Sequence, residues 1–234
     1  MNKLGPVQIV GCVGSPATFR SCTRRAPSDC DWLEVRLDLT GLCDGRWLNW
    51  CAAAQSLGRP VLLTLRSASE GGRWNGTEAE RMALYREALP VVNAVDMEIR
   101  SRGFATLATA ARKHRVRVIG SFHDFTGTPS LSKLARLEAR GRSLGADIVK
   151  IATTVRHATD LATLFALPIQ ANGPICVLGM GERGAISRVA LPCAGSCLAY
   201  GSLVAATAPG QPTCRRLARD LARLGVRSRT AAEK

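Results

Sequence analysis

Gly145-Ala-Asp-Ile-Val-Lys-Ile-Ala-Thr153 is the stretch that decides the fold, because it is a short apolar run, rich in β-branched residues, with a lysine at position 150. Such a run predicts a buried strand, and Lys150 would then be buried with it. Burial strips water from an ammonium group and lowers the pKa of a lysine, which leaves a nucleophilic amine that condenses with ketones. The alternative interpretation is a strand-end lysine with a buried stem and a solvated amine. The other four lysines lie near the termini or in polar helical surroundings: Lys3, Lys113, Lys133 and Lys234.

Runs of the same kind recur along the chain, about 20 to 35 residues apart, as βα units would be spaced. They span residues 7–11, 32–38, 60–66, 94–99, 116–123, 147–152, 175–180 and 196–201. Alternating with helical patterns, they predict an α/β fold, a single-domain (β/α)8 TIM barrel over residues 1–225, followed by a polar C-terminal tail over 226–234. No glycine-rich dinucleotide fingerprint follows any run, which disfavours a doubly wound sheet.

The intervals between the runs contain recognisable helix signals. Thr77-Glu-Ala-Glu80 predicts a capping box that opens a helix reaching about Leu89. Ser130 is expected to cap a helix that ends near Gly141. A last helix is expected after residue 212, ending at Gly225.

Composition excludes several classes of protein. The chain has 234 residues, of which 46% are hydrophobic, so it is long enough to bury a substantial core. We find no signal peptide and no apolar stretch of the ~18 residues that span a bilayer, so we expect a cytoplasmic protein without a membrane partner. Its nine cysteines form no Cys-x-x-Cys pair, and we expect them to be reduced and to bind no metal.

The net charge of +14 comes almost entirely from arginine, since 32 basic residues include only five lysines and therefore 27 arginines. A field of this sign attracts phosphates, carboxylates and nucleic acids. The arginines are spread over predicted helix faces, however, and only 5% of the residues are aromatic. Without aromatic platforms or a DNA-reading motif, we expect a solvated basic surface and no nucleic-acid partner.

Polar side chains alternate with apolar ones along several predicted strands. In a barrel wrapped by helices the apolar face of a strand turns outward, so the polar face points into the barrel, near its carboxyl end. A network of paired structural charges is one explanation. Catalytic residues also collect at this end of a barrel, and an amine, an imidazole, carboxylates and arginines suit an anionic, hydroxylated ketone. The inward residues predicted in this way are Glu34, Arg36, Asp38, Arg66, Asp96, Glu98, Ser121, His123 and Lys150.

Two later loops add candidates. Met180-Gly-Glu-Arg-Gly-Ala-Ile-Ser-Arg188 ends in an arginine that can hold a carboxylate through two parallel hydrogen bonds. Ala206-Thr-Ala-Pro-Gly-Gln211 is a loop of small residues that is expected to act as a lid, with Gln211 reaching inward.

Taken together and in order, these motifs resemble those of the type I 3-dehydroquinate dehydratase family of the shikimate pathway. The resemblance extends from the first strand candidate to the loop after the eighth, which is nearly the whole chain. The motifs are Glu34-Val-Arg-Leu-Asp38, Arg66-Ser-Ala-Ser-Glu-Gly-Gly72, Asp96-Met-Glu98, Ser121-Phe-His-Asp-Phe125 with Thr128-Pro129, Gly145-Ala-Asp-Ile-Val-Lys-Ile151, Met180-Gly, Ile186-Ser-Arg188 and Ala208-Pro-Gly-Gln211.

The resemblance implies a (β/α)8 barrel, a homodimer, and a reaction without a metal or an organic cofactor. It implies that Lys150 forms a Schiff base with the C3 ketone of 3-dehydroquinate. It also implies that His123 takes the C2 proton, protonates the leaving C1 hydroxyl and assists imine hydrolysis, while Glu70 orients His123. A protonated imine is a strong electron sink, and an imidazole with a pKa near the working pH suits the proton transfers.

The resemblance further implies a set of substrate-binding residues. Arg188 would bind the substrate carboxylate, and Thr207 lies where the family pattern has serine in many relatives. We also expect Arg66 and Arg188 to act on Lys150 as like-charged neighbours. The remaining residues would hold hydroxyls and close the pocket: Glu34, Arg36, Arg66 and Gln211.

Two other interpretations stay open at this point. A class I Schiff-base aldolase or related lyase uses a lysine on the same strand of the same fold, and the fold alone does not distinguish it. A non-enzymatic protein that binds anions or nucleic acid through its charge is the other, but it gives no reason for Lys150 and His123 to lie at strand ends.

Overall fold

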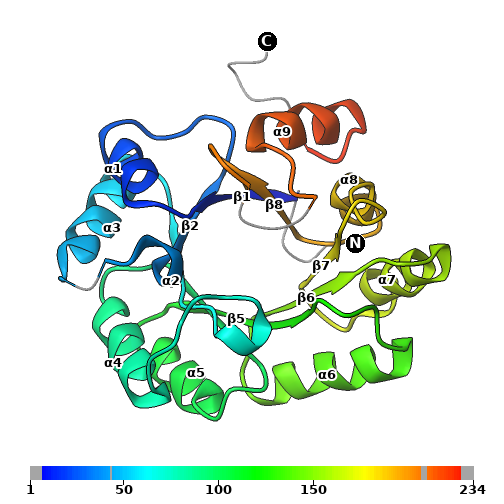
Figure 1. Cartoon of the computed structure of the whole chain (residues 1–234), viewed down its shortest axis with the longest axis horizontal. Helices are drawn as coiled ribbons and strands as arrows, with labels where there is room; N and C mark the ends of the chain where they lie inside the picture. Colours follow the sequence, from blue (N-terminus) through cyan, green and yellow to red (C-terminus); the bar gives the residue numbers. More distant parts are fainter. Residues whose placement is uncertain (1–6, 43, 207–209, 228–234) are drawn as a thin grey trace.

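The computed structural model of the chain describes residues 7–42, 44–206 and 210–227. Its strands all run parallel and pair in the order β7-β6-β5-β4-β3-β2-β1-β8. They form the ring seen in Figure 1, and the helices surround it. The strands are β1 (Gln8–Val13), β2 (Trp32–Arg36), β3 (Val61–Thr64), β4 (Ala94–Glu98), β5 (Arg117–Asp124), β6 (Ile148–Thr154), β7 (Ile175–Met180) and β8 (Leu198–Ser202).

The connecting segments carry the helices, as the alternating pattern predicted. The helices are α1 (Pro16–Arg24), α2 (Leu37–Thr40), α3 (Arg46–Ser56), the 3₁₀ turn η1 (Ala68–Glu70), α4 (Glu78–Ala88), α5 (Phe104–Lys113), α6 (Leu131–Ser143), α7 (Ala158–Gln170), α8 (Ser187–Cys193) and α9 (Cys214–Arg223). The predicted (β/α)8 barrel is thereby confirmed.

The ring of strands is nearly closed between β7 and β8. Backbone N–H of Cys197 donates to the carbonyl of Ile175 at 2.8 Å, and N–H of Val177 donates to Oγ of Ser196 at 2.9 Å. These bonds join the two strands at their amino ends. Because β1 pairs with β8 along its length, residues from the first and last strands meet inside one cavity.

Strand β6 shows how the sequence pattern positions a polar side chain. Val149 and Ile151 turn outward and pack in one apolar cluster with Leu134 of α6 and Leu164 of α7. Successive side chains of a strand point to opposite faces, so Lys150 between them points into the barrel. Helix packing on the outside therefore fixes the direction of the amine inside.

Strand β2 is shorter than predicted. It ends at Arg36, and Asp38 lies in the short helix α2 instead of on the strand. Arg36 donates from Nε and Nη2 to the two carboxylate oxygens of Asp38, at 2.9 and 2.8 Å. This bidentate pair holds the Asp38 carboxylate beside the last residue of the strand.

The helix signals are correct in place but not in every detail. The Thr77 capping box is present, with Thr77 Oγ1 accepting from N–H of Glu80 at 3.2 Å. Ser130 occupies the cap position of α6, but its hydroxyl contacts Ser132 at 3.3 Å and caps no backbone N–H. Helix α9 stops where it was expected to, because its last residue Arg223 is followed by the cap residue Leu224 and by Gly225 at φ +69°.

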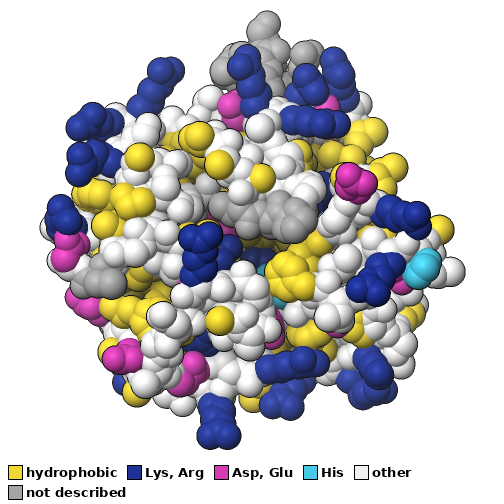
Figure 2. Space-filling view, in the orientation of Figure 1, with side chains coloured by type: hydrophobic (Ala, Val, Ile, Leu, Met, Phe, Trp, Pro, Cys, Tyr) yellow, Lys and Arg dark blue, Asp and Glu magenta, His cyan; other side chains and the backbone are white. Residues whose placement is uncertain are grey.

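Within the described residues, no helix is long and apolar enough to cross a membrane, and no three His, Cys, Asp or Glu side chains are grouped to hold a metal ion. Eight cysteines are described, all are free thiols, and each except Cys193 is buried. Basic side chains are scattered around the face shown in Figure 2 and do not form one continuous patch. Their distribution matches the solvated surface expected from the sequence.

Candidate active site

A cavity opens at the carboxyl end of the barrel, and the space within its lining, together with the solvent at its mouth, amounts to about 720 Å³. The residues that line this cavity come from both halves of the chain. They include every residue that was predicted to have a catalytic or substrate-binding role and that the structure describes. The lining residues are Cys12, Glu34, Arg36, Arg66, Glu70, Gly71, His123, Phe125, Lys150, Ala152, Leu178, Met180, Arg188, Tyr200 and Gln211. Thr207 lies outside the described residues.

Lys150 is 4% exposed, and its amine faces the cavity. Nζ donates to Asp96 Oδ2 at 2.8 Å and lies 3.7 Å from Glu34 Oε1. The Tyr200 ring centroid is 4.1 Å from the same nitrogen. The nearest charged groups are thus two carboxylates, which differs from the expectation that arginines would be the neighbours of this amine.

Arg66 explains that difference, because it is bound by the barrel itself. Its Nη1 donates to Glu98 at 2.8 Å and to Ser121 at 2.6 Å, and its Nη2 donates to Asp96 at 2.5 Å. Burial alone would raise the pKa of Asp96, but Arg66 and Lys150 outweigh it and hold that pKa far below its ordinary value. Arg66 therefore neutralises two buried carboxylates.

A second layer of charge supports this network from outside the barrel. Arg81 of α4 is 1% exposed and places Nη2 2.7 Å from Glu98 Oε2. Burial opposes ionisation of Glu98, but the two arginines beside it, Arg66 first, keep its pKa below the ordinary value. Cations and carboxylates thus alternate from Lys150 out to α4.

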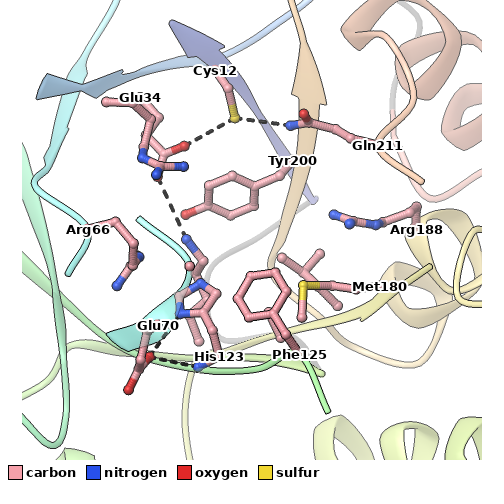
Figure 3. A pocket seen from close by; sticks show the side chains of 15 residues that line it. Cys12, Glu34, Arg66, Glu70, His123, Phe125, Met180, Arg188, Tyr200 and Gln211 are labelled. Atoms are coloured by element: carbon pink, nitrogen blue, oxygen red, sulfur yellow. Dashed lines mark hydrogen bonds and ion pairs between the residues drawn. The ribbon is translucent and has the colours of Figure 1, made fainter. Parts of the chain in front are cut away.

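His123 and Glu70 form the predicted pair. Glu70 Oε2 lies 3.1 Å from Nδ1 of His123 and accepts from its backbone N–H at 2.8 Å. Figure 3 shows them together at one side of the cavity. Because Nδ1 is occupied by Glu70, the other ring nitrogen of His123 is available for proton transfer.

The environment shifts the pKa of both partners. Burial raises the pKa of Glu70 to about 7, although Arg66 acts in the opposite direction. Burial, followed by Arg66 and Lys150, lowers the pKa of His123 well below its ordinary value. The imidazole is therefore neutral, as expected, but its pKa is lower than the expected value near the working pH, because three nearby effects all disfavour the cation.

The turn that presents Glu70 depends on a glycine. Gly71 has φ +78°, in the left-handed region that residues with a Cβ rarely adopt. A Cβ placed there would also overlap the ring of Phe125. Phe125 follows β5, so this contact packs η1 against the strand that carries His123.

Cys12 connects one wall of the cavity to the loop after β8. Its thiol donates to Glu34 Oε2 at 3.1 Å, and Gln211 Nε2 donates to its sulfur at 3.2 Å. Glu34 Oε1 accepts from Thr64 Oγ1 at 2.9 Å. The predicted inward position of Gln211 is therefore correct, and Cys12 is the residue that holds it.

Arg188, near the start of α8, is 3% exposed and lies across the cavity from Arg66 (Figure 3). Burial lowers its pKa, and the Cys12 and Cys176 thiols offset this only in part. The preceding residue fixes the start of the helix, since Ser187 Oγ accepts from N–H of Gly179 at 2.8 Å. A buried guanidinium of this kind gains most from an anionic ligand.

Sequence reasoning placed Asp96 inside the barrel but did not identify it as the partner of Lys150, and it missed Cys12 and Tyr200. Tyr200 is 4% exposed, and its hydroxyl has no hydrogen-bond partner among the described residues. The sequence pattern that could have placed Tyr200 in the cavity is the alternation of inward and outward side chains along β8, because Tyr200 lies two residues after the inward-facing Leu198. A tyrosine in an apolar strand is so common that this signal does not distinguish a site residue.

Known proteins resemble this chain throughout its length. A family model described as Type I 3-dehydroquinase matches residues 13–227. The 3-dehydroquinate dehydratase of Methanocella arvoryzae is 34% identical over 197 residues, which cover 84% of this chain and 89% of that protein. The solved 3-dehydroquinate dehydratase of Geobacillus kaustophilus has a TM-score of 0.87 at 26% identity, covering 96% of this chain and 93% of that one.

A further solved relative carries a covalent ligand. The type I 3-dehydroquinate dehydratase of Clostridium difficile, described with covalently modified comenic acid, has a TM-score of 0.84 at 25% identity and covers 94% of this chain and 93% of its own. These likenesses agree with the resemblance noted in the motifs and do not support the aldolase alternative. The chain belongs to the type I 3-dehydroquinase family.

Proposed function

We propose that this chain is a hydro-lyase that dehydrates 3-dehydroquinate to 3-dehydroshikimate through a Schiff base on Lys150. The observation that carries the proposal is a buried lysine amine that faces the cavity at the carboxyl end of the barrel, next to a strand that carries a histidine paired with a carboxylate. The relatives named above share this activity by name, and family membership makes the same chemistry the first expectation.

The first step forms the covalent bond. The Lys150 amine attacks the C3 carbonyl carbon, water leaves, and a protonated imine remains. Asp96, 2.8 Å from Nζ, and Glu34, 3.7 Å away, carry the negative charge that stabilises this cation. The Tyr200 ring lies 4.1 Å from the same nitrogen and adds a cation–π contact.

His123 then moves the protons. Its neutral imidazole accepts the C2 proton, and the electron pair flows into the imine. The protonated imidazole then gives a proton to the C1 hydroxyl, which leaves as water. Glu70 accepts from Nδ1 and stabilises the imidazolium, whose pKa the carboxylate of a bound substrate would also raise.

The other residues bind and enclose the substrate. Arg188 takes the substrate carboxylate, because it is a buried cation that lies across the cavity from the charged network. We assign hydroxyl contacts and pocket closure to Glu34, Arg36, Arg66, Thr207 and Gln211. Most donors of Arg66 are already engaged, so its main role in this scheme is to hold Asp96 and Glu98 in place.

The remaining expectations concern the protein as a whole. We propose one catalytic domain over residues 1–225 with a polar tail over 226–234, a homodimer, and a cytoplasmic location. The imine itself supplies the electron sink, so the scheme needs no metal or organic cofactor. The mass of the particle in solution, measured by light scattering, tests the dimer.

Borohydride reduction tests the mechanism. Sodium borohydride added in the presence of 3-dehydroquinate should fix the imine as a stable amine, and peptide mass analysis should find the adduct on the peptide containing Lys150. Lys150→Ala should form no adduct and lose at least ~10³-fold in kcat while remaining folded by circular dichroism. Lys133→Ala, an exposed lysine of α6, is the matched control and should behave like the parent chain. An adduct elsewhere, or turnover in Lys150→Ala, would contradict the proposal.

A further inference from the structure

Two cysteines lie directly behind the active-site cavity, on the outer face of β1 and β8. Gly11 of β1 and Gly201 of β8 are register partners in adjacent strands. Helix α9 packs over these two strands from outside (Figure 1). Adjacent strands lie about 4.8 Å apart, so the two glycines leave one continuous hollow on that face.

The sulfur atoms of Cys30 and Cys214 fill this hollow. The Cys30 sulfur lies 2.9 Å from where a Cβ on Gly11 would be, and the Cys214 sulfur lies 2.9 Å from the same point on Gly201. Each thiol is also the largest single influence on the pKa of the other. They are 1% and 2% exposed, respectively. Residues 184 positions apart along the chain thus place their sulfurs over two glycines that are register partners in adjacent strands.

The two thiols are not equivalent. The neighbouring Cys214 thiol lowers the pKa of Cys30 despite its burial, and Arg59 lowers it further. The Cys30 thiol, together with burial, raises the pKa of Cys214. Arg59 is fixed beside this loop, because its Nε donates to the carbonyl of Pro27 at 2.9 Å. Cys30 is therefore the nucleophile of the pair, since the thiolate is the form that reacts.

The pair is connected to the cavity on both sides. Gly11 precedes Cys12, and Gly201 follows Tyr200, so the residues next to both glycines line the active site. Cys214 is the first residue of α9 and comes three positions after Gln211. A second cavity, which Cys214 lines together with Leu203 and Thr213, opens this side of the pair to the surface.

We propose that Cys30 and Cys214 are a redox-sensitive thiol pair, which a peroxide converts into an intrachain disulfide that displaces the end of the loop carrying Gln211. The Cys30 thiolate attacks one peroxide oxygen and breaks the O–O bond, which yields a sulfenic acid and releases water after proton uptake. The Cys214 sulfur then displaces the hydroxyl as a second water. Two thiols and one hydrogen peroxide give one disulfide and two waters, so atoms and electrons balance.

The bond requires movement near the active site. The two sulfurs belong to free thiols and must approach to about 2.05 Å to form the disulfide, and the paired strands β1 and β8 resist displacement. The start of α9 therefore moves, and Gln211 with it, which disturbs its contact with Cys12. A displacement of about 1 Å in a positioning group can cost up to ~10²-fold in rate. We expect kcat/KM to fall about tenfold on oxidation and to recover with dithiothreitol.

The test is hydrogen peroxide treatment of the full chain, followed by alkylation of remaining thiols and non-reducing peptide mass analysis. A linked peptide pair containing Cys30 and Cys214 is expected, together with a higher melting temperature, since a disulfide over so long a loop restricts the unfolded chain. These two readouts do not depend on the proposed dehydratase activity. Absence of the linked peptides, or their formation without a change in kcat/KM, would overturn the proposal.

Three variants separate this pair from other thiols. Cys30→Ser and Cys214→Ser should each abolish the linkage and keep kcat/KM through the peroxide treatment. Cys193→Ser removes the exposed thiol and should respond to peroxide like the parent chain. Cys12 and Cys22 are still present in all three, so a loss of activity in Cys30→Ser and Cys214→Ser would assign the response to another thiol and contradict the proposal.

Discussion

The inside of the barrel has two walls of opposite character. The charged wall is formed on and directly after β2–β6, and the apolar wall is formed by β7, β8 and β1. Lys150 lies between them, with Asp96 at 2.8 Å on one side and the Tyr200 ring at 4.1 Å on the other. The charged wall is Glu34, Arg66, Asp96, Glu98, Ser121 and Lys150, and the apolar wall is Val10, Cys12, Cys176, Leu178, Met180, Leu198 and Tyr200.

The difference shows how one barrel can bury so much charge. On the charged wall every cation has a carboxylate within 3 Å, so desolvation is offset by pairing. The apolar wall excludes water and contributes no competing charge, which strengthens the same interactions across the cavity. A substrate with a carboxylate, hydroxyls and a ketone would form polar contacts with the charged wall. The apolar wall would exclude water from the same substrate.

The largest effect on kcat is expected for a substitution of His123, which lies beside the charged wall and transfers the protons. His123→Ala removes the proton carrier but leaves Lys150 and its carboxylates in place. We expect kcat to fall by about 10²- to 10⁴-fold, the usual contribution of general acid–base catalysis, while borohydride still traps the imine. His114→Ala, on an exposed helix end, is the control. Normal turnover by His123→Ala would remove this residue from the mechanism.

Two buried arginines, Arg66 in the charged wall and Arg188 at the start of α8 beyond the apolar wall, test this distinction. Arg66→Met leaves Asp96 and Glu98 without their main cation, and we expect it to lower the free energy of unfolding by about 3–5 kcal/mol. Arg188→Met, where burial already lowers the pKa of the arginine, should change stability by less than ~1 kcal/mol but raise KM by ~10- to 100-fold. Urea denaturation and steady-state kinetics measure both quantities. Equal losses of stability in the two variants would contradict the distinction between the walls.

Acidification should lower activity by protonating Glu70, which lies beside the charged wall. The pKa of Glu70 is raised to about 7 by burial, so below that pH the carboxylate that accepts from His123 becomes protonated. We expect kcat/KM to fall about tenfold per pH unit below 7 in the parent chain. In Glu70→Gln, kcat/KM should be lower at high pH, and this titration should be absent. A parent profile that stays flat from pH 7 to pH 5 would rule out this role for Glu70.

Protonation of Glu70 should also change the free energy of unfolding. Acidification should lower activity through this group but raise its contribution to stability. The folded chain holds the Glu70 proton up to about pH 7, whereas the unfolded chain releases it near 4.5, the ordinary value. Between these values the folded state binds more protons, so this contribution to stability is complete below pH 4.5 and is lost as the pH rises through 7. The difference in unfolding free energy between parent and Glu70→Gln should therefore shift in that window.

The smallest effect is expected on the apolar wall. Tyr200→Phe removes a buried hydroxyl that has no partner among the described residues and keeps the ring over Lys150. We expect the free energy of unfolding to rise by about 1 kcal/mol, since an unsatisfied buried hydroxyl is costly, with kcat within about threefold. Thermal denaturation and kinetics test this, and a loss of stability would mean that the hydroxyl has a partner.

Local sequence patterns were sufficient for the main elements of this fold. Alternation of apolar strands with helices predicted the barrel, and a lysine flanked by Val149 and Ile151 was necessarily turned inward once those two packed against helices. The same reasoning placed His123 correctly. It failed for Asp38, because the pairing of that carboxylate with Arg36 ends the strand two residues early.

The sequence by itself determined which chemistry was available: an inward amine, an imidazole with a carboxylate, and an arginine beyond the last strands. Only the tertiary structure decided which charges neutralise one another. Asp96 meets Lys150 from 54 positions away, Arg66 is bound by the barrel, and Cys30 meets Cys214 across β1 and β8. Periodicity is a property of neighbouring residues, whereas pairing energies depend on distance and burial, which are set only when the ring of strands closes.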